Sequence, residues 1–428
     1  MIKRKIAFQT FGCKLNFAET STIARLFPED QFEHVSFKEP ADIYVVHSCT
    51  VTSKAEKKTR NAIEQAKKLN PSAKLAVMGC YAQLRPKELE ERSPADIILG
   101  NREKYRLPGI IISENQDRVV EVSNNDIQND VSYKPAYSSN GRTRSFLKIQ
   151  DGCDNFCAYC TVPYARGRSR NNSISQVISN ATEIGHSAIK EIILTGVNIG
   201  DFGKNSGESF FDLIRKLDRV KGIERFRISS IEPDLLSQNI IDFIARSRKF
   251  QEHFHIPLQS GNDNILQRMG RQYSTQLFAE KVRYIKQVMP NACIAADLIV
   301  GFPGETEEQF NETLDFVQSL PLSYLHIFTY SMRPYTKAAI MKNQISQATK
   351  KARSVKMHKA SEAMKTAFYR SQKDSTQSVL WEDSRNGSYI QGWTGNYIKV
   401  THPYAQSKIN TIEKVILKEF KNSNFYIE

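Results

Sequence analysis

The sequence predicts a multidomain α/β protein with an N-terminal α/β open-sheet domain, a central partial (βα)6 barrel and a small C-terminal β-barrel. Two series of alternating strand-like and helix-like runs, separated by a polar stretch, predict the first two parts. A change to short strands with intervening turns near the C-terminus predicts the third part, which is typical of an oligonucleotide-binding (OB-like) barrel. The length of 428 residues is sufficient for about three domains.

The first series of elements occupies residues 1–120, which we expect to form the N-terminal domain. Its most distinct helix covers residues 52–69, where Thr50 or Thr52 can cap the start and Pro71 follows the end. Short apolar runs on either side of such helices are typical of a mostly parallel sheet. The expected strands are residues 5–10, 42–47, 74–78 and 96–99.

A polar linker is expected over residues 121–143, and the second series of elements fills residues 144–368. Six strands, rather than the usual eight of a closed barrel, fit a partial barrel, although periodicity alone does not exclude an open sheet. The expected strands are 144–150, 191–195, 225–230, 253–258, 294–300 and 324–330, with helices at 175–185, 210–220, 233–246, 274–288 and 305–319.

The C-terminal part begins with a basic helix over residues 346–370 and continues into a small β-barrel domain over residues 369–428. Its expected strands are 377–382, 388–393, 396–401, 411–420 and 424–428. Residues 337–428 contain 16 Lys and Arg against 7 Asp and Glu, within a chain whose formal net charge is +14. Because this excess lies in a separate unit, it favours a polyanionic partner over a merely solvated basic face.

Composition excludes several classes of protein. Apolar residues make up 40% of the chain, which is inconsistent with a disordered polypeptide. No apolar run is long enough to cross a membrane, and the N-terminus lacks the apolar core of a secretory signal, so we expect a cytoplasmic protein with no membrane partner. Thiols stay reduced in that compartment, so the seven cysteines indicate metal binding or catalysis rather than disulfides.

Three cysteines lie close together in a C-x3-C-x2-C pattern. Cys153, Cys157 and Cys160, called here the second triplet, follow the first strand of the expected barrel. Thiolates are the ligands of iron–sulfur clusters, and three of them would leave one iron of a four-iron cluster open to a small molecule. Zinc is the alternative, although no nearby Cys or His supplies a fourth ligand at the usual spacing.

Three further cysteines each follow a strand of the N-terminal domain. Cys13, Cys49 and Cys80, called here the first triplet, can converge because ligands in open α/β sheets collect at the carboxyl ends of strands. Gly12 and Gly79 would let the backbone approach a bulky cofactor. The alternative is three ordinary buried cysteines, which is the interpretation we give to Cys293, because it has no partner cysteine nearby.

Together these features resemble the radical SAM methylthiotransferase family along nearly the whole chain. The resemblance extends to sequence blocks at residues 150–153, 163–170, 229–233, 255–261 and 297–305. Residues 11–16, Phe-Gly-Cys-Lys-Leu-Asn, resemble the MtaB type, which acts on N6-threonylcarbamoyladenosine in tRNA. One departure is Tyr335, where the family pattern has Gly, and it puts the local loop shape in doubt.

The resemblance implies an RNA-modifying transferase with two [4Fe-4S] clusters, one on each triplet, and a TRAM RNA-binding domain at residues 369–428. It implies that S-adenosylmethionine is cleaved to a radical at the second triplet, and that two S-adenosylmethionine molecules are used per product. The implied partners are a tRNA anticodon stem-loop and an electron donor of unknown identity, and we expect a monomer. Alternatives are a methylthiotransferase for isopentenyladenosine or a ribosomal protein, and a non-enzymatic, metal-stabilised RNA-binding module.

The resemblance also suggests residues for binding S-adenosylmethionine. Tyr159 is expected against the adenine, with packing beneath the loop as the alternative. The family pattern has an acidic residue after the second barrel strand. This sequence lacks it, so the resemblance implies only a backbone role for the residues at that position. The full candidate set is Tyr159, Thr195, Gly196, Asn198, Ser230, Glu232, Gln259 and Gly301.

The candidates for RNA binding are cations near the second triplet and in the C-terminal domain: Arg166, Arg168, Arg170, Arg385 and Lys399. A solvated charge run is the alternative for the three N-terminal members of this set. Trp381, Tyr389, Trp393 and Tyr397 could stack on bases or fill a small core. His253, His255 and Asp297 are interpreted as structural.

Overall fold

The structure is a computed structural model that describes residues 2–113, 118–123, 127–139, 143–421 and 424–427. Its N-terminal part is a six-stranded parallel sheet in the order β2-β1-β3-β4-β5-β6. The central strands are fully buried and rich in Val, Ile and Ala, as expected for a parallel sheet covered on both faces. The strands are β1 Arg4–Thr10, β2 Phe32–Val35, β3 Ile43–Ser48, β4 Lys74–Gly79, β5 Ile97–Leu99 and β6 Val119–Glu121.

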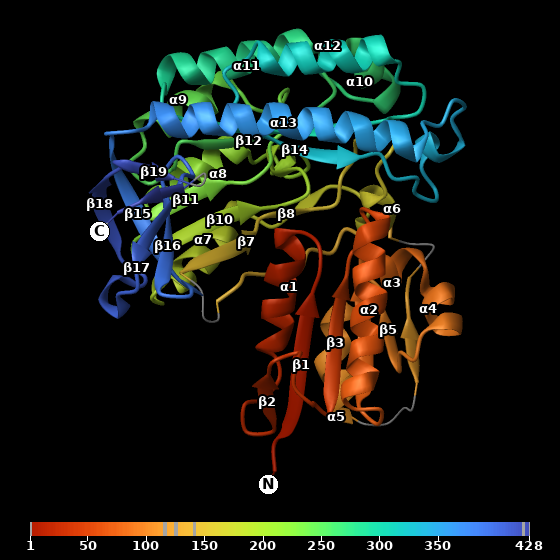
Figure 1. Cartoon of the computed structure of the whole chain (residues 1–428). Coiled ribbons are helices and arrows are strands. Elements are labelled where there is room, and N and C mark those ends of the chain that lie inside the picture. Colours follow the sequence, from red (N-terminus) through yellow and green to blue (C-terminus); the bar gives the residue numbers. More distant parts are fainter. Residues whose placement is uncertain (1, 114–117, 124–126, 140–142, 422–423, 428) are drawn as a thin grey trace.

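Helices cover this sheet and bring their N-termini to the carboxyl ends of its strands. Thr52 caps α2 by accepting a hydrogen bond from the Ala55 backbone N–H at 3.2 Å, which confirms the predicted cap. Figure 1 shows α1 rising from this domain toward β7 of the central part. The helices are α1 Lys14–Ala24, α2 Ser53–Leu69, α3 Cys80–Leu84, α4 Pro86–Arg92, η1 Glu103–Arg106 and α5 Leu107–Ser113.

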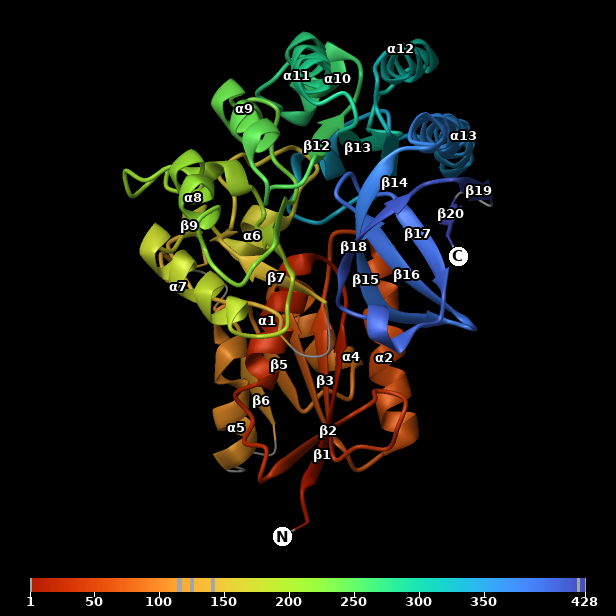
Figure 2. The same ribbon diagram turned by 90° about the vertical axis from the view of Figure 1, so that its left-hand side faces the viewer.

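The central part has six parallel strands in two three-stranded sheets, β11-β10-β7 and β12-β13-β14. Parallel bridges between Phe226 and Phe250 and between Ser230 and His255 join the two sheets into a partial barrel. Figure 2 shows its helices in an arc outside the strands. The strands are β7 Arg144–Lys148, β10 Glu191–Thr195, β11 Arg225–Ile228, β12 His253–Gln259, β13 Cys293–Val300 and β14 Tyr324–Thr329.

Along these strands, alternate side chains point into the apolar core beneath the helices and into the barrel interior. The remaining elements are β8 Gln150–Asp151, α6 Val162–Arg166, β9 Arg170–Asn171, α7 Ile174–Gly185, η2 Ile199–Asp201, α8 Phe210–Leu217, α9 Gln238–Arg246, α10 Asp263–Met269, α11 Thr275–Val288, α12 Glu307–Gln318, η3 Lys337–Ile340 and α13 Gln347–Ser371.

The C-terminal part is a six-stranded sheet in the order β18-β15-β16-β17-β20-β19, with a buried core around Trp381. It packs against the barrel, where Arg225 and Arg227 donate hydrogen bonds to the backbone carbonyls of Trp393 and Gly395 at 3.1 and 2.9 Å. Its elements are β15 Thr376–Asn386, β16 Tyr389–Thr394, β17 Lys399–Pro403, η4 Gln406–Lys408, β18 Ile412–Ile416, β19 Glu419–Lys421 and β20 Asn424–Tyr426.

The predicted elements differ from the structure mainly where strands are short or at an edge. The edge strands β2 and β6 were not predicted, because three or four residues carry little periodicity. The strand expected over residues 411–420 is two strands, β18 and β19. Helix α13 continues through residue 369, the boundary proposed for the last domain. No helix in the described part of the chain is long and apolar enough to cross a membrane.

Candidate functional site

The first triplet converges at the carboxyl edge of the N-terminal sheet. Cys13 precedes α1, Cys49 directly follows β3, and Cys80 begins α3. Gly12 has φ +99°, and a Cβ there would lie 2.9 Å from the Sγ of Cys49, so a larger residue would push into the site. Burial, followed by the charges of Cys80 and Cys13, raises the pKa of Cys49 to about 12. Such a thiol needs a bound metal to be a thiolate at neutral pH.

Two asparagines contact the first and last cysteines of the first triplet, Cys13 and Cys80. Asn16 places its Oδ1 3.7 Å from the Sγ of Cys13. Asn101 places its Nδ2 3.5 Å from the Sγ of Cys80 and donates a hydrogen bond to the Ala165 carbonyl of α6 at 2.8 Å. Asn101 therefore links the first triplet to α6, the helix that follows the loop of the second triplet. Its sequence context alone did not indicate this role.

The second triplet lies on the loop between β8 and α6. Gly152 has φ +71°, and a Cβ there would lie 1.9 Å from the Arg168 carbonyl oxygen, so only glycine fits where the loop folds back. Backbone N–H groups of Asn155 and Val162 point at the Sγ atoms of Cys153 and Cys160 at 3.5 and 3.4 Å. Such donors stabilise sulfur that carries negative charge.

Each triplet supplies three free thiols. Thiolates are the ligands that iron–sulfur clusters use, and three of them leave one iron of a four-iron cluster open to a further ligand. The residues of both triplets therefore fit such a cluster by the chemistry of their donor atoms.

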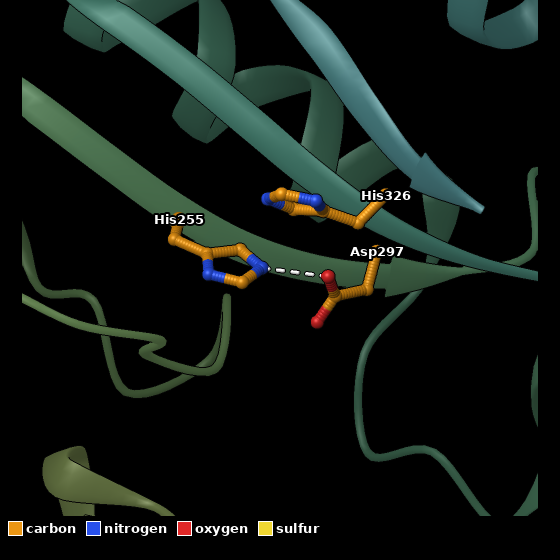
Figure 3. Close-up of side chains that lie close together, drawn as sticks. All are labelled: His255, Asp297 and His326. Atoms are coloured by element: carbon orange, nitrogen blue, oxygen red, sulfur yellow. Dashed lines mark hydrogen bonds and ion pairs between the residues drawn. The ribbon is translucent and has the colours of Figure 1, made fainter. Parts of the chain in front are cut away.

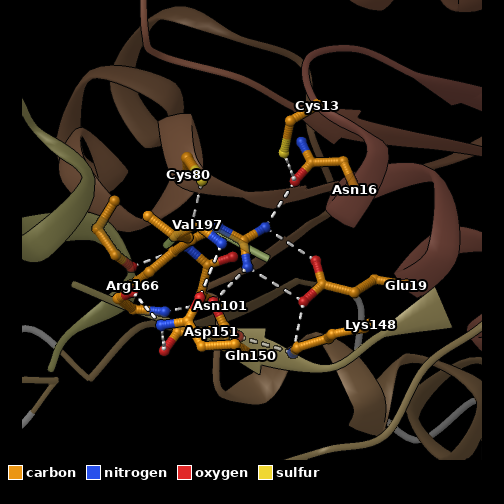
Figure 4. Close-up of polar contacts among 12 residues, drawn as sticks. Cys13, Asn16, Glu19, Cys80, Asn101, Lys148, Gln150, Asp151, Arg166 and Val197 are labelled. Atoms are coloured by element: carbon orange, nitrogen blue, oxygen red, sulfur yellow. Dashed lines mark hydrogen bonds and ion pairs between the residues drawn. The ribbon is translucent and has the colours of Figure 1, made fainter. Parts of the chain in front are cut away.

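A buried network of charges lies beside Cys13 and Cys80 of the first triplet and joins the N-terminal domain to the barrel (Figure 4). At its centre is Glu19 of α1, whose side chain is 0% exposed. The carboxylate accepts from Lys104 at 2.6 Å, Lys148 at 2.9 Å and Arg166 at 2.9 Å. Burial alone would raise the pKa of Glu19, but the charges of Arg166, Lys104 and Lys148 outweigh it and hold that pKa well below its ordinary value.

Arg166 corrects one sequence-based expectation. It was expected to contact RNA, but its side chain is 2% exposed and also pairs with Asp151 at 2.8 Å. Arg170 is largely buried as well and donates to the Ser132 carbonyl at 2.8 Å. Both cations are used inside the protein because they neutralise buried carboxylates. The side chain of Arg168 is 57% exposed, so Arg168 remains a candidate for RNA binding.

The other RNA-binding candidates lie in the C-terminal sheet. Lys399 is partly exposed at the start of β17, and the side chain of Arg385 lies outside the described residues. Trp381 fills the core, and Trp393 stacks on Tyr397 at 4.6 Å between ring centroids, against the barrel. These three rings are therefore packing residues, whereas Tyr389 is 44% exposed.

A cavity of about 230 Å³ separates the triplets and contains two of the predicted S-adenosylmethionine contacts. Tyr159 and Gln259 line it beside Cys160, and Val51 and Thr52 close it from the side of the first triplet. The cavity is therefore the space in which a ligand of one cluster could meet a ligand of the other.

The end of β10 and the turn after it hold three more predicted residues: Thr195, Gly196 and Asn198. The side-chain oxygen of Gln150 accepts from the backbone N–H groups of Val197 and Asn198, both at 2.9 Å, which fixes the turn. The Oδ1 of Asn198 and the Oγ of Ser229 are buried and lack a hydrogen-bond partner among the described residues. Orphaned polar atoms of this kind fit a polar cofactor such as S-adenosylmethionine.

The remaining predicted contacts have partners within the protein. Burial raises the pKa of Glu232 to about 7, although its ion-pair partner Arg271 opposes that shift. Arg271 also donates to the Sγ of Cys157 at 3.1 Å, a contact that the sequence analysis missed. Ser230 bridges to the His255 backbone. The Gly301 N–H donates to Glu305 at 2.7 Å, and its Cα faces Lys350, so it serves packing.

The barrel interior next to this cavity is polar and cationic. His255 pairs with Asp297 at 2.6 Å, which is the structural contact expected for Asp297, and His326 lies beside them (Figure 3). The charge of Lys14 acts on Asp297 and on His326. Burial, together with the neighbouring Arg227, lowers the pKa of Lys14 to about 8, so it remains mostly a cation at neutral pH. Lys14 therefore contributes a positive charge beside Asp297 and His326, and such a charge attracts anionic groups.

Comparisons with known proteins cover the domains that carry both triplets. A model described as Uncharacterized protein family UPF0004 matches residues 5–100, and one described as Radical SAM superfamily matches residues 147–317. The solved structure of the radical S-adenosylmethionine methyltransferase TsrM from Kitasatospora setae, with tryptophan substrate and a SAM analogue, has a TM-score of 0.59 at 14% identity. It covers 79% of this chain and 75% of that chain, and shows the fold alone.

Curated relatives match over nearly the full length. The threonylcarbamoyladenosine tRNA methylthiotransferase MtaB of Bacillus subtilis is 36% identical over 424 residues, covering 96% of this chain and 94% of that protein. The tRNA-2-methylthio-N(6)-dimethylallyladenosine synthase of Natranaerobius thermophilus is 31% identical, covering 99% and 96%. Both relatives are methylthiotransferases, and they are named for different adenosines. The chain therefore belongs to the radical SAM tRNA methylthiotransferase family and is a transferase that modifies tRNA.

Proposed function

We propose that this protein converts N6-threonylcarbamoyladenosine beside the tRNA anticodon to its 2-methylthio derivative. The first and second triplets would each hold a [4Fe-4S] cluster, and the residues around the 230 Å³ cavity would hold S-adenosylmethionine. When bound, these groups supply the radical that activates the adenine C–H bond and the sulfur that replaces its hydrogen. The protein's own part is to position the nucleoside between the two clusters and to exclude water.

The cationic barrel interior is the observation that favours threonylcarbamoyl over dimethylallyl adenosine. Among the described residues, no carboxylate lies within ion-pair distance of Lys14, and Asp297 is already paired with His255. The threonyl group carries a carboxylate that could pair with Lys14. A dimethylallyl group would leave that cation desolvated and unpaired, which is costly.

The roles of Asn198, Ser229 and Arg271 follow from the same arrangement. Asn198 and Ser229 would satisfy their buried orphan atoms on S-adenosylmethionine. Arg271 would donate to the sulfur of Cys157 and thereby stabilise the negative charge on the cluster. An electron donor and the tRNA anticodon stem-loop complete the set of proposed partners.

Nucleoside mass spectrometry of tRNA tests the substrate assignment. Cells lacking the gene should lose 2-methylthio-N6-threonylcarbamoyladenosine and accumulate its precursor, and the wild-type gene should restore the product. Loss of the 2-methylthio dimethylallyl nucleoside instead would assign the other substrate. If both 2-methylthio nucleosides persist, neither is made by this protein.

Purified holoenzyme tests the role of Lys14. Lys14→Met should raise KM for a threonylcarbamoyladenosine stem-loop by about 10- to 100-fold, the range for a lost charge-assisted hydrogen bond. Its iron and sulfide content should stay unchanged, because Cys13 is intact. Lys57→Met, at an exposed position of α2, is the matched control. An unchanged KM in Lys14→Met would remove the carboxylate argument.

A further inference from the structure

Tyr335 is a strained and exposed aromatic residue beside the site. Its φ is +67°, a backbone conformation that favours glycine, and its side chain is 64% exposed. A bulky residue in this conformation persists only where the surroundings impose it, and such outliers cluster at functional sites. The position therefore calls for an explanation in terms of what the ring contacts.

The ring of Tyr335 is the outer end of a row of aromatic side chains. It lies 6.5 Å from the ring of Tyr164, which lies 5.7 Å from that of Phe156. Arg168 covers the far side of Phe156, with its guanidinium carbon 4.8 Å from the ring centroid. Tyr164 and Phe156 belong to the segment that carries the second triplet, so the row is anchored on the cluster loop.

Tyr335 and Tyr164 also line a cavity of about 650 Å³. Residues 83–88, which begin three positions after Cys80 of the first triplet, also line it. The two cavities draw lining residues from the same two segments of the chain, because Val162 and Ser331 line the smaller cavity and Tyr164 and Tyr335 line the larger.

The charge around the larger cavity suits a polyanion. Among the described residues that line it, the one carboxylate is that of Glu88, which is paired with Arg85 at 2.8 Å. Lys87 is exposed on the same wall and forms no ion pair with the residues that the structure describes. An aromatic ring beside an uncommitted cation is the combination that binds unstacked nucleic-acid bases and their phosphates.

We propose that Tyr335, backed by Tyr164 and Phe156, is a platform on which an unpaired base of the RNA substrate stacks beside the reacting nucleoside. The proposal rests on the RNA substrate of the proposed function, and not on which adenosine modification is used. A nucleoside in the smaller cavity places the next nucleotide of its strand near the larger one. The ring would hold that neighbour out of the RNA stack, so that the target nucleoside stays accessible.

The test compares Tyr335→Gly with Tyr335→Phe in the full-length holoenzyme. Gly relieves the backbone strain and removes the ring, whereas Phe retains the ring. Binding of a fluorescent anticodon stem-loop carrying threonylcarbamoyladenosine is measured by anisotropy at one fixed salt concentration. Tyr335→Gly should raise Kd by about 5- to 100-fold, and Tyr335→Phe should stay within about twofold of wild type.

Thermal unfolding and kinetics separate stacking from a structural role. Tyr335→Gly should unfold at the same temperature as wild type or higher, whereas KM for the stem-loop should rise together with Kd. Ile340→Ala, at a position 88% exposed in η3, is the control and should bind as wild type. Unchanged binding by Tyr335→Gly, or equal weakening by Tyr335→Phe, would overturn the stacking proposal.

The outcome is distinguishable from failure of the proposed function. If wild-type enzyme binds the stem-loop through Tyr335 but does not methylthiolate it, the substrate assignment fails and the platform stands. If wild-type enzyme converts the stem-loop and Tyr335→Gly binds it equally well, the platform fails and the substrate assignment stands.

Discussion

Replacement of Glu19 by Gln should loosen the joint between the N-terminal domain and the barrel. Glu19 is fully buried and contacts three cations, Lys104, Lys148 and Arg166, at 2.6 to 2.9 Å. Gln keeps the shape of the side chain but leaves these cations with less negative charge. Breaking a buried ion pair by neutralising one partner costs about 3–5 kcal/mol.

Amide hydrogen exchange measures this loss of stability in the elements that form the joint. A loss of about 3–5 kcal/mol corresponds to exchange that is between about 100- and 4,000-fold faster, at about 1.4 kcal/mol per factor of ten. The acceleration should be found in α1 and β7, which meet at the joint.

The matched control is Glu121→Gln. Glu121 pairs with Arg106 at 2.6 Å, but the two side chains are 30% and 65% exposed. A pair this exposed contributes about 0–1 kcal/mol, so exchange near it should change little. If Glu19→Gln accelerates exchange no more than Glu121→Gln does, the buried network does not hold the domains together.

Three further predictions concern pH, the second cluster loop and the metal content. The pKa values of Glu19 and Asp151 lie below their unfolded values, so their contribution to apo-protein stability is present above about pH 4 and is lost as pH falls further. The stability gap between wild type and Glu19→Gln in urea titrations should therefore narrow below about pH 4, and a constant gap would contradict this. Gly152→Ala should lose the iron of the second triplet by elemental analysis. Gly207 has nearly the same φ as Gly152 but open space where a Cβ would lie, so Gly207→Ala should keep that iron and lose only about 1–2 kcal/mol of folding stability. Equal iron content in both variants would refute the steric argument. Replacing the first triplet with Ala should remove about four of about eight irons, whereas Cys293→Ala, in the C-terminal core, should remove none.

The sequence by itself predicted the candidate ligands and determined the order of the elements. Spacing predicts that Cys153, Cys157 and Cys160 serve one site, because a short loop keeps them close in any fold. Alternating periodicity predicted β10 over the residues that form it, Glu191–Thr195, and located the other five barrel strands to within two residues at each end. Local patterns suffice for such features because they depend on near neighbours in the chain.

Only the tertiary structure decided which of the charged side chains are buried. Arg166, Arg168 and Arg170 have the same local pattern, yet one is buried against Glu19, 147 residues away in the sequence, and Arg168 remains exposed. Arg271 meets Cys157 across 114 residues, and Asn101 meets Ala165 across 64. No periodicity records these contacts, because they arise when segments far apart in the chain pack together. The cysteines can therefore be found from the sequence, whereas the groups that position them and join their domains cannot.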